Sequence, residues 1–164
     1  MSEYCVVVAE GSRARFFTVE PAEIPELQSG PHLIEHKTMV NPEHKVHTAE
    51  IMADRTGSNR SGGGQRHDYD DHREQRDDEM ERRFARDIAR QLDNMTRGNG
   101  TRKVVVCAEK RMLGFLRPTL QGTIPNGVSL REVQKDLAKL SPRQLHDHLA
   151  RDGYIPRRMA RNSH

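Results

Sequence analysis

Two short apolar runs constrain the fold of this chain more than any other feature. Tyr4–Ala9 and Lys103–Ala108 are almost uninterrupted hydrophobic segments, a pattern typical of strands that are covered on both faces. Between them, apolar residues recur every four positions, which predicts a long helix over about 78–95. The stripe consists of Met80, Phe84, Ile88 and Leu92. A covered strand, a long helix and a second covered strand together predict a crossover connection and a parallel strand pair.

The other segments complete an α/β fold, a mixed sheet with an antiparallel start, a parallel extension and helices against it. Arg13–Val19 alternates charged and apolar residues and is expected to form a hairpin with the first run. Ser141-Pro142 has the composition of a helix N-cap followed by a first-turn proline. We further expect strands at His32–Val40 and Val128–Leu137, a helix at Met112–Leu120 stopped near Pro118, and a closing helix that ends at Gly153. The predicted domain covers 1–153, followed by a frayed basic tail at 154–164.

Composition restricts the class of protein. The 164 residues suit one domain, and 27 Lys and Arg against 24 Asp and Glu leave a net charge of only +3. This balance argues against a bulk polycation and permits only a local basic face. The sequence has no secretion signal and no apolar run of about 18 residues, so we expect a cytoplasmic protein without membrane insertion. Cys5 and Cys107 lie in the apolar runs and are predicted to be buried thiols.

Four stretches resemble the bacterial family described as "protein required for attachment to host cells". They are Val6–Phe17, Val40-Asn41-Pro42, Arg82-Arg83-Phe84-Ala85-Arg86 and Lys135–Ser141. That family in turn resembles the middle domain of archaeal and eukaryotic class-1 translation termination factors, which has a ribonuclease-H-like α/β fold. In those factors, a Gly-Gly-Gln loop precedes a helix that carries Phe-Ala-Arg. Here Gly63-Gly64-Gln65 lies upstream of Phe84-Ala85-Arg86.

The resemblance implies a role on the ribosome or with transfer RNA, in which Gly63, Gly64 and Gln65 would assist hydrolysis of the peptidyl-transfer-RNA ester. Glycines let backbone N–H groups approach a developing oxyanion, and a glutamine amide can position a water. Two departures count against a complete termination factor. A charged stretch, Arg66–Asp77, separates the tripeptide from the predicted helix, and the chain has no room for codon-reading domains.

The predicted loop at 44–77 leaves several interpretations open. Gly63-Gly64-Gln65 could instead belong to a flexible linker or a non-catalytic contact loop. The family description also suggests a second function, a protein-interaction factor that contributes indirectly to attachment. Arginines around the loop could form a phosphate-binding face, although interspersed acids also fit a solvated helix surface. The RNA-binding candidates are Arg60, Arg66, Arg82, Arg83 and Arg86, with Arg73, Arg76 and Arg90 nearby.

A metal site is the weaker interpretation of the histidine and acid run that follows the glycines. Its residues, in a loop expected to be mobile, mix imidazole and carboxylate groups, but metal ligands usually need a rigid scaffold. We therefore favour a solvated charge run and expect no metal or cofactor. The two apolar runs also lack the carboxylates that a two-metal nuclease would need. The run consists of His67, Asp68, Asp70, Asp71, His72 and Glu74, and we interpret His32, His36, His44 and His47 as surface residues.

Overall fold

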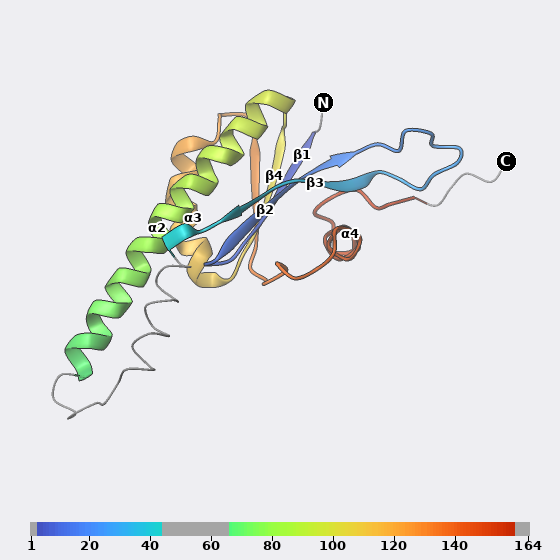
Figure 1. Ribbon diagram of the computed structural model, residues 1–164. Coiled ribbons are helices and arrows are strands. Elements are labelled where there is room, and N and C mark those ends of the chain that lie inside the picture. Colours follow the sequence, from blue (N-terminus) through green and yellow to red (C-terminus); the bar gives the residue numbers. More distant parts are fainter. Residues whose placement is uncertain (1–2, 44–65, 160–164) are drawn as a thin grey trace.

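The computed structural model describes residues 3–43 and 66–159, with side chains from residue 75 onward in the second range. Within this part, five strands form one mixed sheet in the order β3-β2-β1-β4-β5 (Figure 1). The first hairpin pairs antiparallel, whereas β1, β4 and β5 run parallel. The strands are β1 Tyr4–Ala9, β2 Arg13–Glu20, β3 His32–Val40, β4 Lys103–Cys107 and β5 Ser129–Val133. The predicted α/β mixed sheet, its hairpin and its parallel pair are confirmed.

In the part of the chain that the structure describes, three helices cover the two faces of this sheet. α2 Arg66–Asn99 and α3 Lys110–Thr123 pack against one face, and α4 Pro142–Arg151 packs against the other (Figure 1). The alternation of side chains along β1 supplies both cores, because successive residues of a strand point to opposite faces. Cys5 and Val7 join the α2/α3 core, whereas Val6 and Val8 join the α4 core.

The two thiols lie on opposite faces of the sheet. Cys5 belongs to the α2/α3 core and Cys107 to the α4 core, so they cannot form a disulfide with each other. Burial disfavours the thiolate and raises the pKa of both cysteines to about 12. The prediction of two buried thiols is confirmed.

α2 is longer than the sequence predicts, and the expected loop is wrong from Arg66 onward. The helix starts at Arg66 rather than near Asp78, and it ends at Asn99, before Gly100 with a φ of 64°. Among its residues from Gln75 onward, whose side chains are described, the first buried one is Met80. The preceding 14 residues, about 20 Å of helix, extend past the sheet (Figure 1). Without a sheet to cover, this part needs no apolar stripe, so hydrophobic periodicity could not reveal it.

Three smaller predictions are corrected near the C-terminus. α3 continues through Pro118 to Thr123, because its buried stripe goes on to Leu120 beyond the proline. The last strand ends at Val133, earlier than predicted. The following residues instead turn back onto the sheet, where Leu137 and Ala138 are buried.

The chain after α4 is docked rather than frayed as far as Met159. Ile155 is buried in the α4 core, and the buried His146 lies with its Nε2 2.9 Å from the carbonyl oxygen of Pro156. Met159 forms an isolated bridge with Gly30 in the β2–β3 connection. Two buried groups and one bridge therefore hold this segment.

Candidate functional site

The long helix determines where the tripeptide enters the fold. Residues Arg60, Gly63, Gly64 and Gln65 lie outside the described residues, and Arg66 is described only as the first backbone position of α2. The chain therefore passes from Gln65 into α2 with no residue between them. The charged stretch that the sequence suggests as a spacer is itself the projecting part of the helix.

The three described RNA-binding candidates share one carboxylate. Arg82 Nη1 lies 3.5 Å from Glu79 Oε2, and Arg83 Nε lies 3.5 Å from Glu79 Oε1. Arg86 Nη2 is 4.0 Å from the same carboxylate. Arg83 also donates a hydrogen bond to Glu43, and this bond, together with the charge of Glu43, raises the pKa of the Arg83 guanidinium. All three arginines are exposed, but each already faces an acid.

A second ion-pair group adjoins this one across the α2–α3 contact. Arg111 at the start of α3 donates to Asp78 at 2.6 Å and to Glu81 at 3.0 Å. Arg82 and Arg111 both lie over the ring of Phe115. Four arginines here face four carboxylates. The arginines are Arg82, Arg83, Arg86 and Arg111, and the carboxylates are those of Glu43, Asp78, Glu79 and Glu81. We call the surface around Arg82, Arg83 and Arg86 the α2 arginine face. Its net charge is thus close to zero where it meets α3 and the end of β3.

The histidine and acid run lies in helix rather than in a loop. Residues 67–74 belong to the projecting part of α2, but their side chains lie outside the described part. Among the described residues, no three His, Cys, Asp or Glu side chains are grouped as a metal site. His36 Nε2 lies 2.5 Å from the hydroxyl of Thr18. His44 and His47 fall outside the described residues.

The stretches that carry the family resemblance meet in space. Asn41 is buried and donates from its amide to the carbonyl of Gly11 at 3.0 Å, which ties the end of β3 to the β1–β2 turn. Arg13 and Arg15 on β2 both donate to the carbonyl of Ala138, at 2.8 and 2.9 Å. These stretches, far apart in sequence, therefore brace one end of the sheet.

Arg15 is the more buried of these two arginines. Its side chain is only 10% exposed, its Nε donates to Glu35 at 2.5 Å, and its Nη1 also donates to the carbonyl of Leu140 at 2.7 Å. The guanidinium lies 5.0 Å from the ring centre of Phe17. Every one of these partners is within the chain, so Arg15 is a structural residue.

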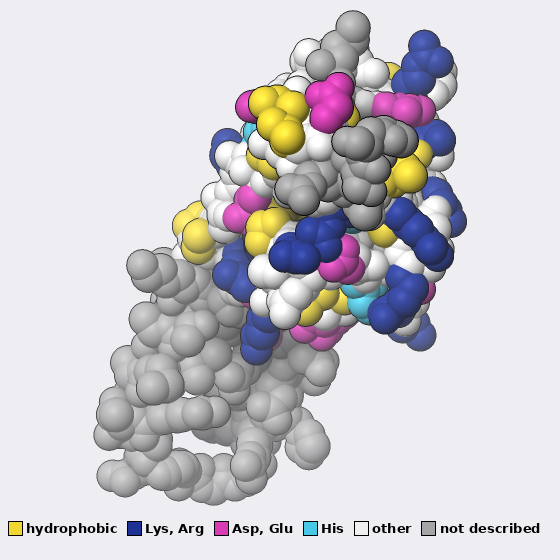
Figure 2. Space-filling model, turned by 90° about the vertical axis from the view of Figure 1, so that its right-hand side faces the viewer, with side chains coloured by type: hydrophobic (Ala, Val, Ile, Leu, Met, Phe, Trp, Pro, Cys, Tyr) yellow, Lys and Arg dark blue, Asp and Glu magenta, His cyan; other side chains and the backbone are white. Residues whose placement is uncertain are grey.

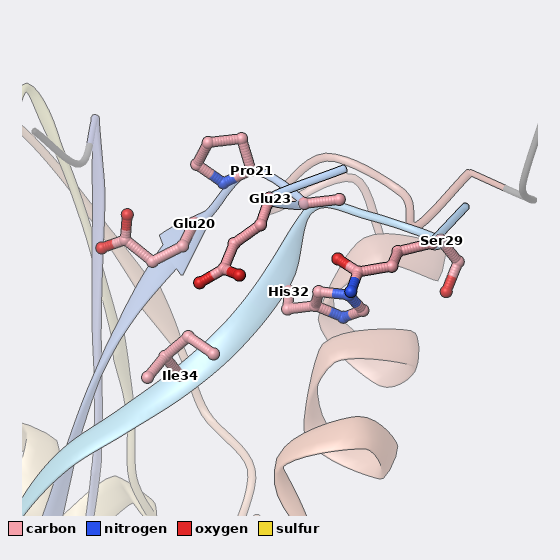
Figure 3. A pocket seen from close by; sticks show the side chains of 8 residues that line it. Glu20, Pro21, Glu23, Ser29, His32 and Ile34 are labelled. Carbon is pink, nitrogen blue, oxygen red and sulfur yellow. The ribbon is translucent and has the colours of Figure 1, made fainter. Parts of the chain in front are cut away.

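A hollow of about 1070 Å³ opens beside the β2–β3 connection, at the other end of the hairpin from Glu43 and α2. Glu20, Glu23 and His32 line it. The imidazole of His32 extends toward Ser29 rather than toward the two carboxylates (Figure 3). The hollow therefore does not pair these groups for acid–base work.

A group of basic residues around the end of α4 was not predicted from the sequence. Lys135 and Arg151 both lie against His148 in the last turn of α4, and Arg131 on β5 reaches the carbonyl of Gly153 just after that helix. In Figure 2, which looks onto the α4 side of the sheet, Lys and Arg side chains follow the right-hand edge. These residues have no regular spacing in the sequence, and no periodic signal marks them.

Within the described residues, no helix combines the length and the apolar character that crossing a membrane requires. The fold and the braced sheet end define a small α/β domain that carries a long projecting helix. A search of the curated proteins found no match to the chain. The family model described as "Protein required for attachment to host cells" matches residues 5–149. The chain belongs to this family.

Proposed function

We propose that this chain is an RNA-associated accessory domain that presents Gly63-Gly64-Gln65 to transfer RNA on the ribosome. The observation that carries the proposal is the start of α2 at Arg66, immediately after Gln65. The termination-factor middle domain has the same order, a helix that follows Gly-Gly-Gln almost at once. The projecting part of α2 supports the proposal further, since Arg66, the residue that follows Gln65 in the sequence, begins the end of the helix that extends past the sheet (Figure 1).

The chemistry proposed for the tripeptide is ester hydrolysis. A water attacks the carbonyl carbon of the peptidyl ester, and the products are the free peptide acid and the transfer-RNA hydroxyl. A glutamine amide is no base at neutral pH, so Gln65 would orient the water while backbone N–H groups stabilise the oxyanion. Gly63 and Gly64 allow the backbone to approach the ester closely, because they carry no Cβ.

A second candidate function is a protein-interaction factor that contributes indirectly to attachment, in keeping with the family description. A hollow of about 550 Å³ favours it, because prolines and the side chain of Met159 line it. Met159 is 71% exposed and Leu27, in the neighbouring connection, is 64% exposed. Such apolar exposure is typical of a protein-binding surface.

Co-sedimentation with ribosomes across a salt series tests the first function against the second. The wild-type chain is compared with Gln65→Ala. Salt-sensitive binding by the wild-type chain and by Gln65→Ala supports association through RNA. Absence of binding at every salt concentration would refute the ribosomal function and favour protein partners.

A peptide-release assay with ribosome-bound peptidyl-transfer RNA then tests the catalytic step. Gln65→Ala should abolish release, and it should leave the fold unchanged because Gln65 precedes α2, whose first buried side chain from Gln75 onward is that of Met80. Equal release by wild-type and Gln65→Ala chains would contradict a catalytic role for Gln65.

A further inference from the structure

The α4-end cluster, defined as Arg131, Lys135, His148, Arg151, Asp152 and Tyr154, differs from the α2 arginine face in its charge. The cluster holds three cationic side chains and one carboxylate, that of Asp152, so it carries two excess positive charges before any charge on His148 is counted. Lys135 lies 3.2 Å from Asp152. Among the described residues, neither Arg131 nor Arg151 forms an ion pair with any acid.

The cluster also has an excess of hydrogen-bond donors over acceptors. Lys135 Nζ lies 3.3 Å from Nε2 of His148, and Arg151 Nη2 lies 3.3 Å from Nδ1 of the same ring. A neutral imidazole has one acceptor nitrogen, so it cannot accept from both cations. The cluster therefore has more donors than acceptors, which is the arrangement that a phosphate oxygen satisfies.

The nearby cations lower the pKa of Asp152, which agrees with an excess of positive charge in the cluster. The hydrogen bond from Lys135 lowers the pKa of Asp152, and the charges of Lys135, His148 and Arg151 lower it further. Its carboxylate stays ionised and holds Lys135 in place. It does not neutralise the other cations.

An aromatic ring adjoins the cations. Arg131 lies over the ring of Tyr154 with its guanidinium carbon 4.4 Å from the ring centre, and its Nη1 is 3.2 Å from the carbonyl of Gly153. Nucleic-acid bases stack on tyrosine rings and on guanidinium planes, and this contact is tolerant of sequence. A stacking surface beside a donor-rich cluster is complementary to a flexible phosphodiester strand with unpaired bases.

The fold holds the cluster rigidly. Val133 and Leu149 are buried in the same core, which fixes β5 against the last turn of α4. The capping box of Ser141 and Gln144 fixes the other end of the helix. Arg131 and Arg151 therefore project from two braced elements, and Lys135 follows the first of them, with its backbone N–H bonded to the carbonyl of Val133.

We propose that the α4-end cluster binds single-stranded RNA, with Arg131, Lys135 and Arg151 on phosphates and Tyr154 against a base. This inference deepens the proposed function and rests on its RNA association, but it uses the α4 side of the sheet, opposite α2. The α2 arginine face makes a weaker contact because its arginines already have carboxylate partners.

The test is fluorescence anisotropy of a labelled octauridylate with the full-length chain over a salt series. Two variants are compared, and each replaces three basic residues by Gln. The first changes Arg131, Lys135 and Arg151, and the matched control changes Arg82, Arg83 and Arg86. Each removes three positive charges, so a difference between them reports position rather than net charge. Far-ultraviolet circular dichroism verifies that both variants fold.

The first variant should lose roughly ten-fold or more in affinity at 0.1 M salt, and its salt slope should fall by about 2 because three phosphate contacts are lost. The control should stay near wild type. Tyr154→Leu should weaken binding by roughly five-fold or more, since one stacking contact is removed. The ring signals of His148 and Tyr154 in NMR spectra should shift when the octauridylate is added.

Equal losses in the two triple variants, or no octauridylate binding by the wild type at 0.05 M salt, would overturn the proposal. Co-sedimentation with ribosomes separates this failure from failure of the proposed function. Ribosome binding that persists without octauridylate binding would refute the α4-end cluster alone. Octauridylate binding without ribosome binding would refute the ribosomal function and leave the cluster standing.

Discussion

Replacement of Arg15 by methionine tests the bracing of the sheet end most directly. The substitution keeps an apolar stem but removes the charge and all the donors. The guanidinium, which is only 10% exposed, donates to Glu35 and to the carbonyls of Ala138 and Leu140. Hydrogen bonds that involve a charged group contribute about 1.5–3 kcal/mol each, and removing one partner of a buried ion pair costs about 3–5 kcal/mol.

Two features reduce the expected loss for Arg15→Met. Glu35 is 31% exposed and can be hydrated, and the carbonyl of Ala138 keeps its bond from Arg13. We therefore expect the free energy of unfolding to fall by about 3–4 kcal/mol, or about 10 °C in Tm. Urea unfolding followed by circular dichroism measures this change.

Arg13→Met is the matched control, because Arg13 lies on the same strand and donates to the same carbonyl. Its side chain is 39% exposed, and we expect a loss of only about 1 kcal/mol. The double variant should lose more than the sum of the single variants, since it leaves the Ala138 carbonyl without either donor. A loss for Arg15→Met no larger than that for Arg13→Met would refute the argument that Arg15 braces the sheet.

Three further predictions concern stability. Burial raises the pKa of Cys5 and Cys107 from 9.0 to about 12, so their contribution to the free energy of unfolding is complete below pH 9 and is lost between pH 9 and 12. Replacing either cysteine by Ala should reduce this decline by about 1.4 kcal/mol per pH unit, measured by urea titration at several pH values. Gly30→Ala should destabilise by about 1–3 kcal/mol because its methyl would lie 2.7 Å from another side chain, whereas Gly114→Ala, with no neighbour within 4 Å, should stabilise α3 by about 0.5–1 kcal/mol. Thermal unfolding of the two variants measures both changes. A stabilised Gly30→Ala variant or a destabilised Gly114→Ala variant would contradict this account of the space around the two glycines. Ser141→Ala should cost about 1 kcal/mol through loss of the capping box, and an unchanged midpoint of urea unfolding would count against that cap.

Local patterns in the sequence determined most of the sheet and its covering. The apolar runs Tyr4–Ala9 and Lys103–Ala108 specified strands covered on both faces, because only a central strand can bury nearly every side chain. The stripe from Met80 to Leu92 specified the packed part of α2, and Ser141 specified the start of α4. The family resemblance was likewise present in local stretches, and the match over residues 5–149 confirmed it.

The projecting part of α2 could not be predicted in the same way. A stretch of helix that extends past the sheet has no sheet to cover and so no reason to repeat apolar residues at period 3.6, and the residues before Met80 therefore resembled a charged loop. For the same reason, the sequence placed a spacer between Gln65 and the helix where the structure has none. At Pro118 the sequence predicted too short a helix rather than too long a loop. The helix α3 continues beyond the proline because Leu120 is buried against the sheet.

Tertiary structure alone decided how the charges are paired. Sequence spacing could suggest that Arg82, Arg83 and Arg86 share a helix surface, but not that Glu43 from another element lies against Arg83. Equally, Arg131 reaches the carbonyl of Gly153, just after α4, because β5 and α4 pack on one core. Helix and strand periods are local properties of the chain, whereas the neutralisation of a charge depends on which distant segments the fold brings within a few ångströms.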